Sequence, residues 1–351
     1  MHRITLALLL AACSGGQPEK KPEAPKPAPE APKPPPEPPK PAIPEAHTAL
    51  FKALEKAKPN PADKAKIDLG RMLYYDTRLS AANDISCNSC HMLDAFGVDH
   101  QPTSPGHKGQ RGARNSPTTL NAFLQFVQFW DGRAADVEAQ AQGPVLNPVE
   151  MAMADAKAVE AALSAVPAYK DAFTAAFPGQ ESPVTFNNMA SAIGAFERNL
   201  VTPGRFDAYL KGDATALTAD EKAGLELFIS TGCTSCHNGV LVGGSSFQKL
   251  GAVVPYETKD QGRFEVTKND NDKLMFKVPS LRNIDKTGPY FHDGSVATLE
   301  EAVQKMGKHQ LGKDLSPSEI GSIVTFLKAL TGEVDASYVA KPELPPAAPK
   351  K

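Results

Sequence analysis

Apolar residues recur every three or four positions in several segments of the chain, which is the spacing of one face of an α-helix. Residues 60–76 follow this spacing and begin with Asn60, a good N-cap, before a proline at the first helical position. Residues 218–230 follow it as well, behind a capping box of Thr218 and Glu221. The pattern predicts one helix over each segment.

A third strong helix is predicted near the C-terminus, where Ser316 is the N-cap and Gly332 is the expected stop. Its apolar stripe predicts a buried face: Ile320, Ile323, Val324, Leu327 and Leu330. Alanine-rich helical patterns also cover residues 155–166 and 187–200. Because no alternating strand pattern of any length accompanies them, the predicted fold class is mainly α.

The N-terminal residues have the composition of targeting and linker segments. Residues 1–12 combine Arg3 with an apolar run too short to span a bilayer, and the following "LAAC" resembles a bacterial lipobox. We expect a signal peptide whose removal leaves a lipid-bearing Cys13 as the mature N-terminus; a plain signal peptide with a chance cysteine is the alternative. The predicted location is therefore the periplasm, with the protein tethered to a membrane.

Thirteen of the 32 prolines lie between residues 17 and 46, together with five lysines and five glutamates. This composition cannot form a core and favours extended polyproline II, so residues 13–46 are predicted to be a tether. Residues 336–351 are predicted to be a disordered tail. The formal net charge of −2 offers no basic excess, and no nucleic-acid partner is expected.

The cysteines indicate the chemistry of the protein. Apart from Cys13, all of them fall in two matching motifs, "CNSCH" and "CTSCH". C-x-x-C-H is the attachment motif of c-type haem, in which two cysteines form thioethers and the histidine binds the iron. A four-cysteine zinc site and thioredoxin-like redox pairs are the alternatives. The predicted haem-binding residues are Cys87, Cys90, His91, Cys233, Cys236 and His237.

The second axial ligand of each iron is less evident from the sequence. For the second haem we favour Met306, on a loop shortly before the last helix, over Met275, His292 and His309. For the first haem, His100 and His107 follow in a loop rich in glycine and proline. His107 has the more mobile setting, which favours a ligand that can leave.

From about residue 60 to 330 the chain resembles the bacterial di-haem cytochrome c peroxidases. The segments that carry the resemblance, in the family's order, are "CNSCH", "GVDHQPTSPGH", "RNSPTTLNA", "FWDGRA", "QAQGPVLNPVEM", "GCTSCHNG", "FKVPSLRN", "GPYFHDG" and "MGKHQLG". The resemblance implies two tandem cytochrome c-like domains, each with one covalently bound haem. Residues 47–215 would form the N-terminal peroxidatic, low-potential haem domain, and residues 216–335 the C-terminal electron-transfer, high-potential haem domain.

The resemblance also implies a role for individual residues. His107 would be a displaceable ligand of the first haem and Met306 the fixed ligand of the second. Glu150 would be the acid and base beside the peroxide, assisted by Gln140, and Trp130 would lie between the haems. A calcium ion would be bound by Asn115 and by backbone oxygens of Thr287 and Pro289.

The activity implied by the resemblance is reduction of hydrogen peroxide to water with electrons from a small donor, a cytochrome c or a cupredoxin. Electrons would enter at the C-terminal haem and pass to the N-terminal haem. Homodimers are common in such a family. Two alternatives are a di-haem oxidase of a protein substrate, of the methylamine dehydrogenase maturation type, and a non-enzymatic di-haem electron carrier. The protein oxidase has a tyrosine at the position of Met306, so the methionine argues against it. An electron carrier has no need of an acid such as Glu150.

Overall fold

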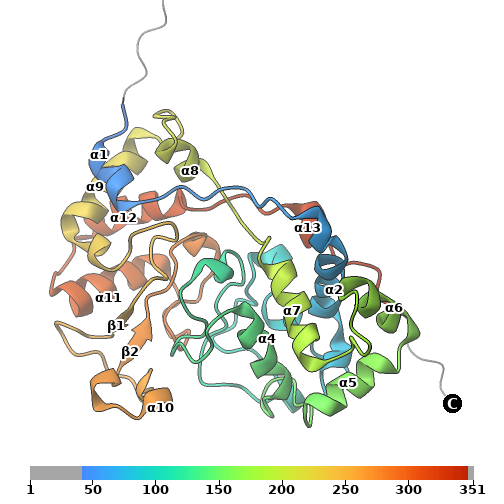
Figure 1. The fold of residues 1–351 in the computed structure, drawn as a ribbon. Helices are drawn as coiled ribbons and strands as arrows, with labels where there is room; N and C mark the ends of the chain where they lie inside the picture. Colours follow the sequence, from blue (N-terminus) through green and yellow to red (C-terminus); the bar gives the residue numbers. More distant parts are fainter. Residues whose placement is uncertain (1–41, 347–351) are drawn as a thin grey trace, which may run out of the picture. The chain divides into compact units, whose positions relative to one another are not determined.

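The computed structural model describes residues 42–346 and is mainly helical, as predicted (Figure 1). The helices are α1 (Glu45–Leu50), α2 (Lys64–Tyr75), α3 (Cys87–Cys90), α4 (Val137–Leu146), α5 (Ala156–Ser164), α6 (Pro167–Ala176), α7 (Phe186–Glu197), α8 (Arg205–Leu210), α9 (Ala219–Thr231), α10 (Phe264–Thr267), α11 (Leu299–Leu311), α12 (Pro317–Lys328) and α13 (Ala336–Val339). The only strands among the described residues, β1 (Phe247–Lys249) and β2 (Met275–Lys277), form an antiparallel pair.

The first hydrophobic core gathers α2 and α4 to α7. Helices α2 and α7 cross closely because Gly70 has no side chain; a Cβ there would clash with the carbonyl oxygen of Ala192. Tyr74, on the next position after Leu73, is fully buried and packs edge-on against Phe196 with ring centroids 5.4 Å apart. This core supports the first haem-attachment motif, which follows α2.

The second hydrophobic core is built around α9 and α12, with α8 and α11 beside them. A glycine again allows two helices to approach closely, because a Cβ at Gly224 of α9 would clash with the carbonyl oxygen of Ser322 of α12. The predicted apolar stripe of α12 is buried in this core, as its spacing indicated. Each haem motif therefore follows a helix that a glycine holds close to a later helix.

The predicted helix starts are confirmed. Asn60 accepts a hydrogen bond from the backbone N–H of Ala62 at 3.1 Å, and a short 3₁₀ turn then leads into α2. The Thr218 and Glu221 capping box forms at α9, and Ser316 caps α12.

The predicted stop of the last helix is wrong. Helix α12 ends at Lys328, four residues before Gly332. Gly332 instead packs against the segment before α8, where a Cβ would clash with the carbonyl oxygen of Thr202, and its N–H donates to Asn283 Oδ1 at 2.9 Å. The glycine serves a close backbone approach and does not end the helix.

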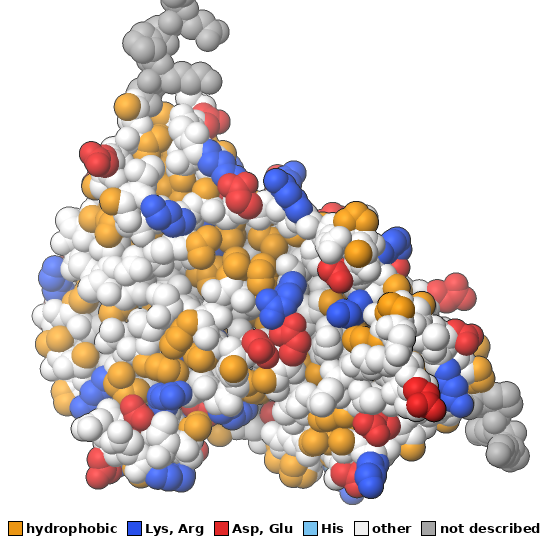
Figure 2. Space-filling model, in the orientation of Figure 1, with side chains coloured by type: hydrophobic (Ala, Val, Ile, Leu, Met, Phe, Trp, Pro, Cys, Tyr) orange, Lys and Arg blue, Asp and Glu red, His pale blue; other side chains and the backbone are white. Residues whose placement is uncertain are grey.

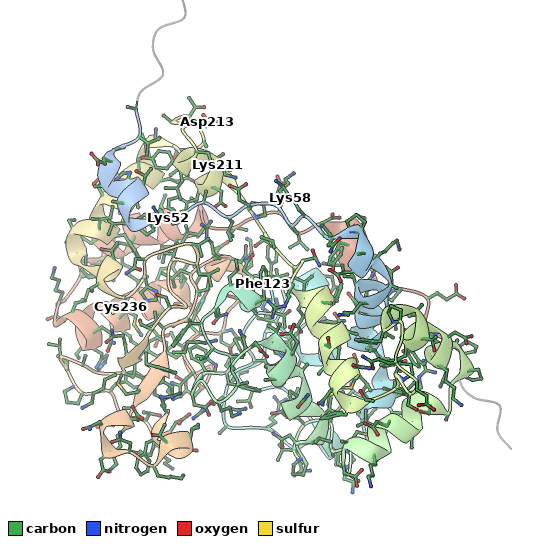
Figure 3. The ribbon with its side chains drawn as sticks, in the orientation of Figure 1. Lys52, Lys58, Phe123, Lys211, Asp213 and Cys236 are labelled. Carbon is green, nitrogen blue, oxygen red and sulfur yellow. The ribbon has the colours of Figure 1, made fainter. Side chains whose placement is uncertain are left out.

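The N-terminal described segment packs on the second core, although residues from 47 onwards were predicted to belong to the N-terminal haem domain. His47 is buried and its Nδ1 lies 2.8 Å from the hydroxyl of Tyr209, while the N–H of Leu54 donates to Asp207 Oδ1 at 2.6 Å. The chain then runs without a helix past Lys52 and Lys58 to α2 (Figure 3). The predicted boundary between the two haem domains, at residues 215 and 216, also differs from the packing in the structure. Phe206 and Tyr209 precede that boundary and already belong to the second core.

The predicted disorder of the C-terminal tail is wrong for residues 336–346. Tyr338 of α13 stacks on Phe196 with ring centroids 5.1 Å apart, and its hydroxyl donates to the carbonyl oxygen of Phe196 at 2.9 Å. An aromatic ring with both a stacking partner and a hydrogen-bond acceptor orders the segment that carries it. The two ends of the described chain thus cross, each packing on the core of the other half.

The predicted signal peptide, Cys13 and nearly all of the proline-rich tether lie outside the described residues, as do residues 347–351. Within residues 42–346, no helix is both long and apolar enough to cross a membrane. On the face shown in Figure 2, side chains of both charge signs are interspersed, in keeping with the small net charge.

Candidate haem sites

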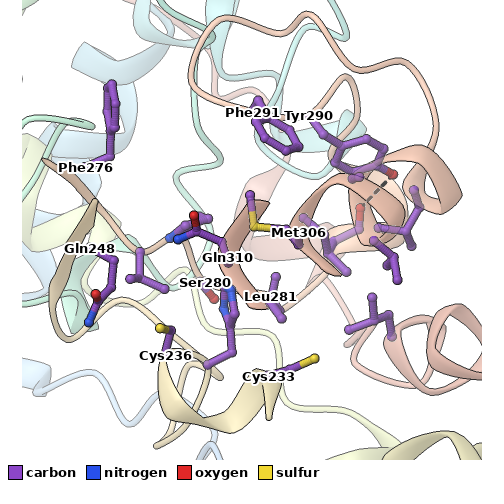
Figure 4. Close-up of a pocket in the computed structure, with 18 of the residues that line it drawn as sticks. Cys233, Cys236, Gln248, Phe276, Ser280, Leu281, Tyr290, Phe291, Met306 and Gln310 are labelled. Atoms are coloured by element: carbon purple, nitrogen blue, oxygen red, sulfur yellow. Dashed lines mark hydrogen bonds between the residues drawn. The ribbon is translucent and has the colours of Figure 1, made fainter. Parts of the chain in front are cut away.

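The C-terminal site is an apolar cavity that holds the second C-x-x-C-H motif. Cys233 and Cys236 lie at the turn that follows α9, and both line the cavity together with His237 (Figure 4). His237 Nδ1 donates to the carbonyl oxygen of Val242 at 3.2 Å, which leaves Nε2 free. Burial lowers the pKa of His237 to about 4, so the imidazole is neutral at pH 7, as an iron ligand must be.

Met306 lines the same cavity as His237, and Figure 4 shows its side chain reaching in from α11, away from Cys233 and Cys236. The prediction that Met306 lies on a loop is wrong, because Met306 lies within the regular helix α11. Thr298 caps this helix, and its hydroxyl oxygen accepts a hydrogen bond from the N–H of Glu301. The helix forms because this segment has a good cap and a well-spaced apolar face.

The rival ligands of the second site are placed differently. Met275 and His309 do not line the cavity, and His309 Nδ1 lies 3.0 Å from the carbonyl oxygens of Val254 and Pro255. His292 does line it, but its Nε2 lies 3.1 Å from the Thr258 hydroxyl. The structure therefore brings Met306 together with His237, while the ligand role of Met306 stays a prediction.

The N-terminal site is formed around α3, which contains Cys87 and Cys90. His91 follows directly, and its carbonyl oxygen accepts a hydrogen bond from the buried hydroxyl of Tyr74 at 2.8 Å. Burial lowers the pKa of His91 and favours its neutral form. The Nδ1 atoms of His91 and His107 are both buried without a hydrogen-bond partner. Two half-buried imidazoles, each with a buried Nδ1 that lacks a partner and one of them in a C-x-x-C-H motif, fit a haem as the group bound there.

Glu150 lies close to the N-terminal attachment motif. Burial is the largest cause of the raised pKa of Cys90, about 11, and the charges of Asp99 and Glu150 raise it further, which places Glu150 within electrostatic reach of this thiol. Burial raises the pKa of Glu150 itself, opposed by Arg133 and by the amide of Asn147, which donates to Glu150 Oε1 at 3.0 Å. The second carboxyl oxygen of Glu150 is left for another partner.

The turn that carries His107 is hydrogen-bonded to the turn that carries Glu150. The backbone N–H of His107 donates to the carbonyl oxygens of Val149 and Glu150, at 3.0 and 2.7 Å. The approach depends on Gly106, because a Cβ there would clash with the carbonyl oxygen of Val149. The proposed leaving ligand and the proposed acid therefore sit on two segments that contact each other through the backbone.

Gln140 is not brought to this site by any hydrogen bond. It lies half-buried on α4, and its side chain has no hydrogen-bond partner within residues 42–346. His100, the rival of His107, is exposed, and its Nδ1 lies 3.0 Å from the carbonyl oxygen of Gly288. Of the two loop histidines, only His107 is joined to Glu150.

Trp130 and Asn115 both line the C-terminal cavity although they belong to the N-terminal half of the chain. The indole N–H of Trp130 donates to the carbonyl oxygen of Asn115 at 3.0 Å. Asn115 Nδ2 donates to the carbonyl oxygens of Gln101 and Pro102, so its Oδ1 is free to bind a cation. Thr287 and Pro289 line the same cavity. An amide oxygen and backbone carbonyls are the kind of ligand that calcium takes.

The four described cysteines are free thiols, and none forms a disulfide. Within residues 42–346, no group of three or more histidine, cysteine or acidic side chains is arranged to hold a metal ion. The alternative of one zinc site shared by both cysteine pairs is therefore not formed.

One residue of the C-terminal site was missed in the sequence. Lys277 lines the cavity with only 4% of its surface exposed. The signal was present, because this lysine interrupts the apolar run from Phe276 to Val278 in "FKVPSLRN", where a solvated surface lysine is not expected.

A mainly helical fold with two C-x-x-C-H sites defines a c-type cytochrome with two haem-attachment sites. A family model described as di-haem cytochrome c peroxidase matches residues 64–215. The chain is 49% identical over 299 residues to cytochrome c551 peroxidase of Nitrosomonas europaea, covering 84% of this chain and 87% of that protein. It is 45% identical over 302 residues to cytochrome c551 peroxidase of Pseudomonas aeruginosa, covering 83% and 87%. The chain belongs to the di-haem cytochrome c peroxidase family.

The fold agrees with this assignment. A solved MauG-like protein associated with microbial copper homeostasis superposes with a TM-score of 0.71 at 30% identity, covering 82% of this chain and 96% of that one. The resemblance stated from the sequence motifs is thus confirmed, and so is the fold class. Membership of this family implies two haems, one for each C-x-x-C-H motif.

Proposed function

We propose that this protein reduces hydrogen peroxide to water with two electrons from an external donor, consuming two protons and releasing two water molecules. Peroxide would react in the N-terminal haem domain, and electrons would enter at the C-terminal haem domain. A c-type haem bound at each C-x-x-C-H motif would supply the redox chemistry, because haem iron exchanges electrons and can bind a small molecule.

The observation that carries the proposal is the contact between the His107 turn and the Glu150 turn. The backbone N–H of His107 donates to the carbonyl oxygens of Val149 and Glu150, so a shift of the backbone at His107 would disturb the turn that carries Glu150. Displacement of the His107 side chain would leave room beside the half-buried carboxyl group of Glu150, which can transfer protons. A pure electron carrier has no use for this arrangement.

Glu150 is suited to proton transfer by its surroundings. Burial raises its pKa toward the operating pH, which is where a general acid and base works best. The Asn147 amide holds Oε1 and fixes the rotamer, while the other carboxyl oxygen is free to take a proton from one peroxide oxygen and deliver it to the other. Gln140 has no side-chain hydrogen-bond partner among residues 42–346, so its amide would be available to assist.

Met306 and Trp130 support the direction of electron flow. Methionine as the partner of a ligating histidine raises the reduction potential, which suits a site that accepts electrons from a donor. Trp130 comes from the N-terminal half and lines the cavity of the C-terminal site, so it connects the two parts of the chain. Methionine at position 306, in place of tyrosine, also favours peroxide reduction over oxidation of a protein substrate.

We further propose a calcium ion bound by Asn115 and the backbone oxygens of Thr287 and Pro289. The three residues line one cavity and come from both halves of the chain, so a shared cation would order the contact between the halves. The proposed location is the periplasm, with a lipid on Cys13 and the proline-rich segment as a spacer. The electron donor would be a small cytochrome c or a cupredoxin from the same compartment.

The test is peroxide turnover by the purified holoprotein, supplied with a reduced small cytochrome c or cupredoxin. The control is the double variant Cys87→Ser and Cys90→Ser, which should lack the N-terminal haem and keep the C-terminal one. We expect the wild-type protein to oxidise the donor in a peroxide-dependent way, and the double variant to accept electrons once without turnover. Equal turnover by both proteins would refute peroxide reduction at the N-terminal site.

A further inference from the structure

Lys277 is a buried cation in the wall of the C-terminal cavity. It lies on β2, is 4% exposed, and is the only lysine, arginine, aspartate or glutamate among the described residues that line this cavity. The rest of the wall is mostly apolar, with a few uncharged polar groups. A charged side chain is rarely buried in such surroundings without a partner.

The hydrogen bonds of Lys277 leave most of its ammonium group unused. Its Nζ donates one hydrogen bond, to the carbonyl oxygen of Val127 at 3.2 Å. A lysine ammonium has three N–H donors, so two have no acceptor among residues 42–346. Because the side chain lines the cavity, a group bound there can accept them.

Within the described part of the chain, no carboxylate forms an ion pair with Lys277. The one acidic group that raises its pKa is Asp131, and Asp131 already pairs with Arg114 and Arg133. Burial is the larger effect and lowers the pKa of Lys277 to about 7. Burial therefore brings Lys277 close to losing its proton at neutral pH, and a nearby anion would raise its pKa again.

The ring of a c-type haem carries two propionate side chains, which are carboxylates at neutral pH. We propose that Lys277 Nζ pairs with a propionate of the haem attached at Cys233 and Cys236, and that this pair favours the reduced state of that haem. The inference rests on haem attachment in the C-terminal cavity, which is part of the proposed function, but it does not depend on peroxide turnover.

Lys277 would favour the reduced haem because of the sign of the charge that reduction adds. Reduction adds one negative charge to the haem, and a fixed ammonium in a cavity of low dielectric stabilises the more negative state. Lys277 would thus add to the effect of Met306 on the same site.

Lys277 also holds the loop that carries Trp130. Its backbone N–H donates to the carbonyl oxygen of Trp130 at 2.8 Å, while its Nζ donates to that of Val127 in the same loop. A haem carboxylate bound to Nζ would therefore connect the C-terminal haem to this loop from the N-terminal half. Lys277 is in this sense a positioning residue.

The test is a spectroelectrochemical titration of the holoprotein, in which the reduction potential of the His237 haem is measured in three variants. Lys277→Met removes the charge and keeps the apolar stem, Lys277→Gln removes the charge and keeps a donor for Val127, and Lys277→Arg keeps the charge. Lys249→Met is the matched control, because Lys249 is an exposed lysine on the neighbouring strand β1.

We expect both neutral variants to shift the one-electron equilibrium at least tenfold toward the oxidised haem, which is a fall of about 59 mV for a one-electron couple. The reduction potentials of Lys277→Arg and Lys249→Met should stay closer to the wild-type value than those of the two neutral variants. Wild-type potentials in both neutral variants, with two haems attached per chain, would overturn the inference. Absence of the C-terminal haem from the wild-type protein would instead refute the proposed function.

Discussion

At the scale of single residues, the proposed proton transfer depends on Glu150. We expect Glu150→Gln to keep both haems but to lower peroxide turnover by roughly 100-fold or more, the usual contribution of a positioned acid and base. Glutamine keeps the size of the side chain and its acceptor for Asn147, so the loss would report the missing proton.

Steady-state turnover with a reduced donor measures this effect, and haem content measured by absorption serves as the check on folding. Glu181→Gln is the matched control because Glu181 is an exposed glutamate of the same half of the chain. Unchanged turnover in Glu150→Gln would remove Glu150 from the mechanism.

Glu197 provides a prediction about stability and pH. This side chain of α7 is 4% exposed, and burial, with Glu138 nearby, raises its pKa from 4.5 to about 8. Between these two values the unfolded chain has lost the proton and the folded protein keeps it. The free energy of unfolding therefore falls as pH rises through this window, by about 1.4 kcal/mol per pH unit at most.

Glu197→Gln removes that dependence. We expect the variant to match the wild type near pH 4.5 and to be more stable by a few kcal/mol, roughly 3–5, near pH 8. Urea unfolding of the holoproteins at a series of pH values measures the difference, with Glu181→Gln as the control. Parallel stability curves for Glu197→Gln and wild type would contradict the raised pKa.

The residues of the site differ in how far the sequence could predict them. The two C-x-x-C-H motifs are local, and a local motif needs no knowledge of the fold. The residues on either side of Glu150 do not mark it as a proton donor. Its role as acid and base was therefore predicted only from the resemblance to the family. The apolar neighbours of Lys277 mark it as an unusual position, but the sequence does not specify the loop that covers it, because its hydrogen-bond acceptor Val127 lies 150 residues away.

At the scale of helices and strands, sequence predicted the starts of helices better than their ends. Each of the caps at Asn60, Thr218 and Ser316 involves only residues up to three positions further along the chain. All three caps are present in the structure. The end of α12 depends instead on how Gly332 packs against Thr202, which is a contact between distant segments. Met306 was expected in a loop because the loop was inferred by analogy with small cytochromes c and not from the local sequence, in which Thr298 caps a helix.

The short helix α13 is the element whose role the sequence concealed. Three of its contacts join it to the first core: Tyr338 stacks on Phe196, its hydroxyl donates to the same residue, and the Tyr75 hydroxyl donates to the carbonyl oxygen of Val339. Proline-rich composition after residue 340 suggested disorder, but composition does not reveal a distant docking surface.

We expect Tyr338→Ala to lower the free energy of unfolding by about 2–4 kcal/mol, because it removes both the stacked ring and the hydrogen bond. Tyr338→Phe keeps the ring and should cost about 1 kcal/mol. Denaturant unfolding of the holoproteins measures both, with the exposed Lys341→Ala as the control. A loss in Tyr338→Ala no greater than in the control would show that α13 does not stabilise the fold.

At the scale of the whole molecule, the described chain consists of two helical cores whose terminal segments cross. Residues near His47 pack on the second core and residues near Tyr338 on the first. Side chains of the N-terminal half also line the C-terminal cavity, notably Asn115 and Trp130. The proposed gating requires that a change at one site reaches the other, and these shared contacts offer a route for it.

The central claim is that electron entry at the C-terminal site opens the N-terminal site by release of His107. The most direct measurement is low-temperature EPR of the holoprotein, fully oxidised and after addition of one electron per molecule, with His107→Gly in parallel. We predict that half-reduction converts one low-spin signal to a high-spin form, and that His107→Gly has this form already when oxidised. If both irons of the wild type stay six-coordinate in both states, the claim is contradicted and the protein is an electron carrier.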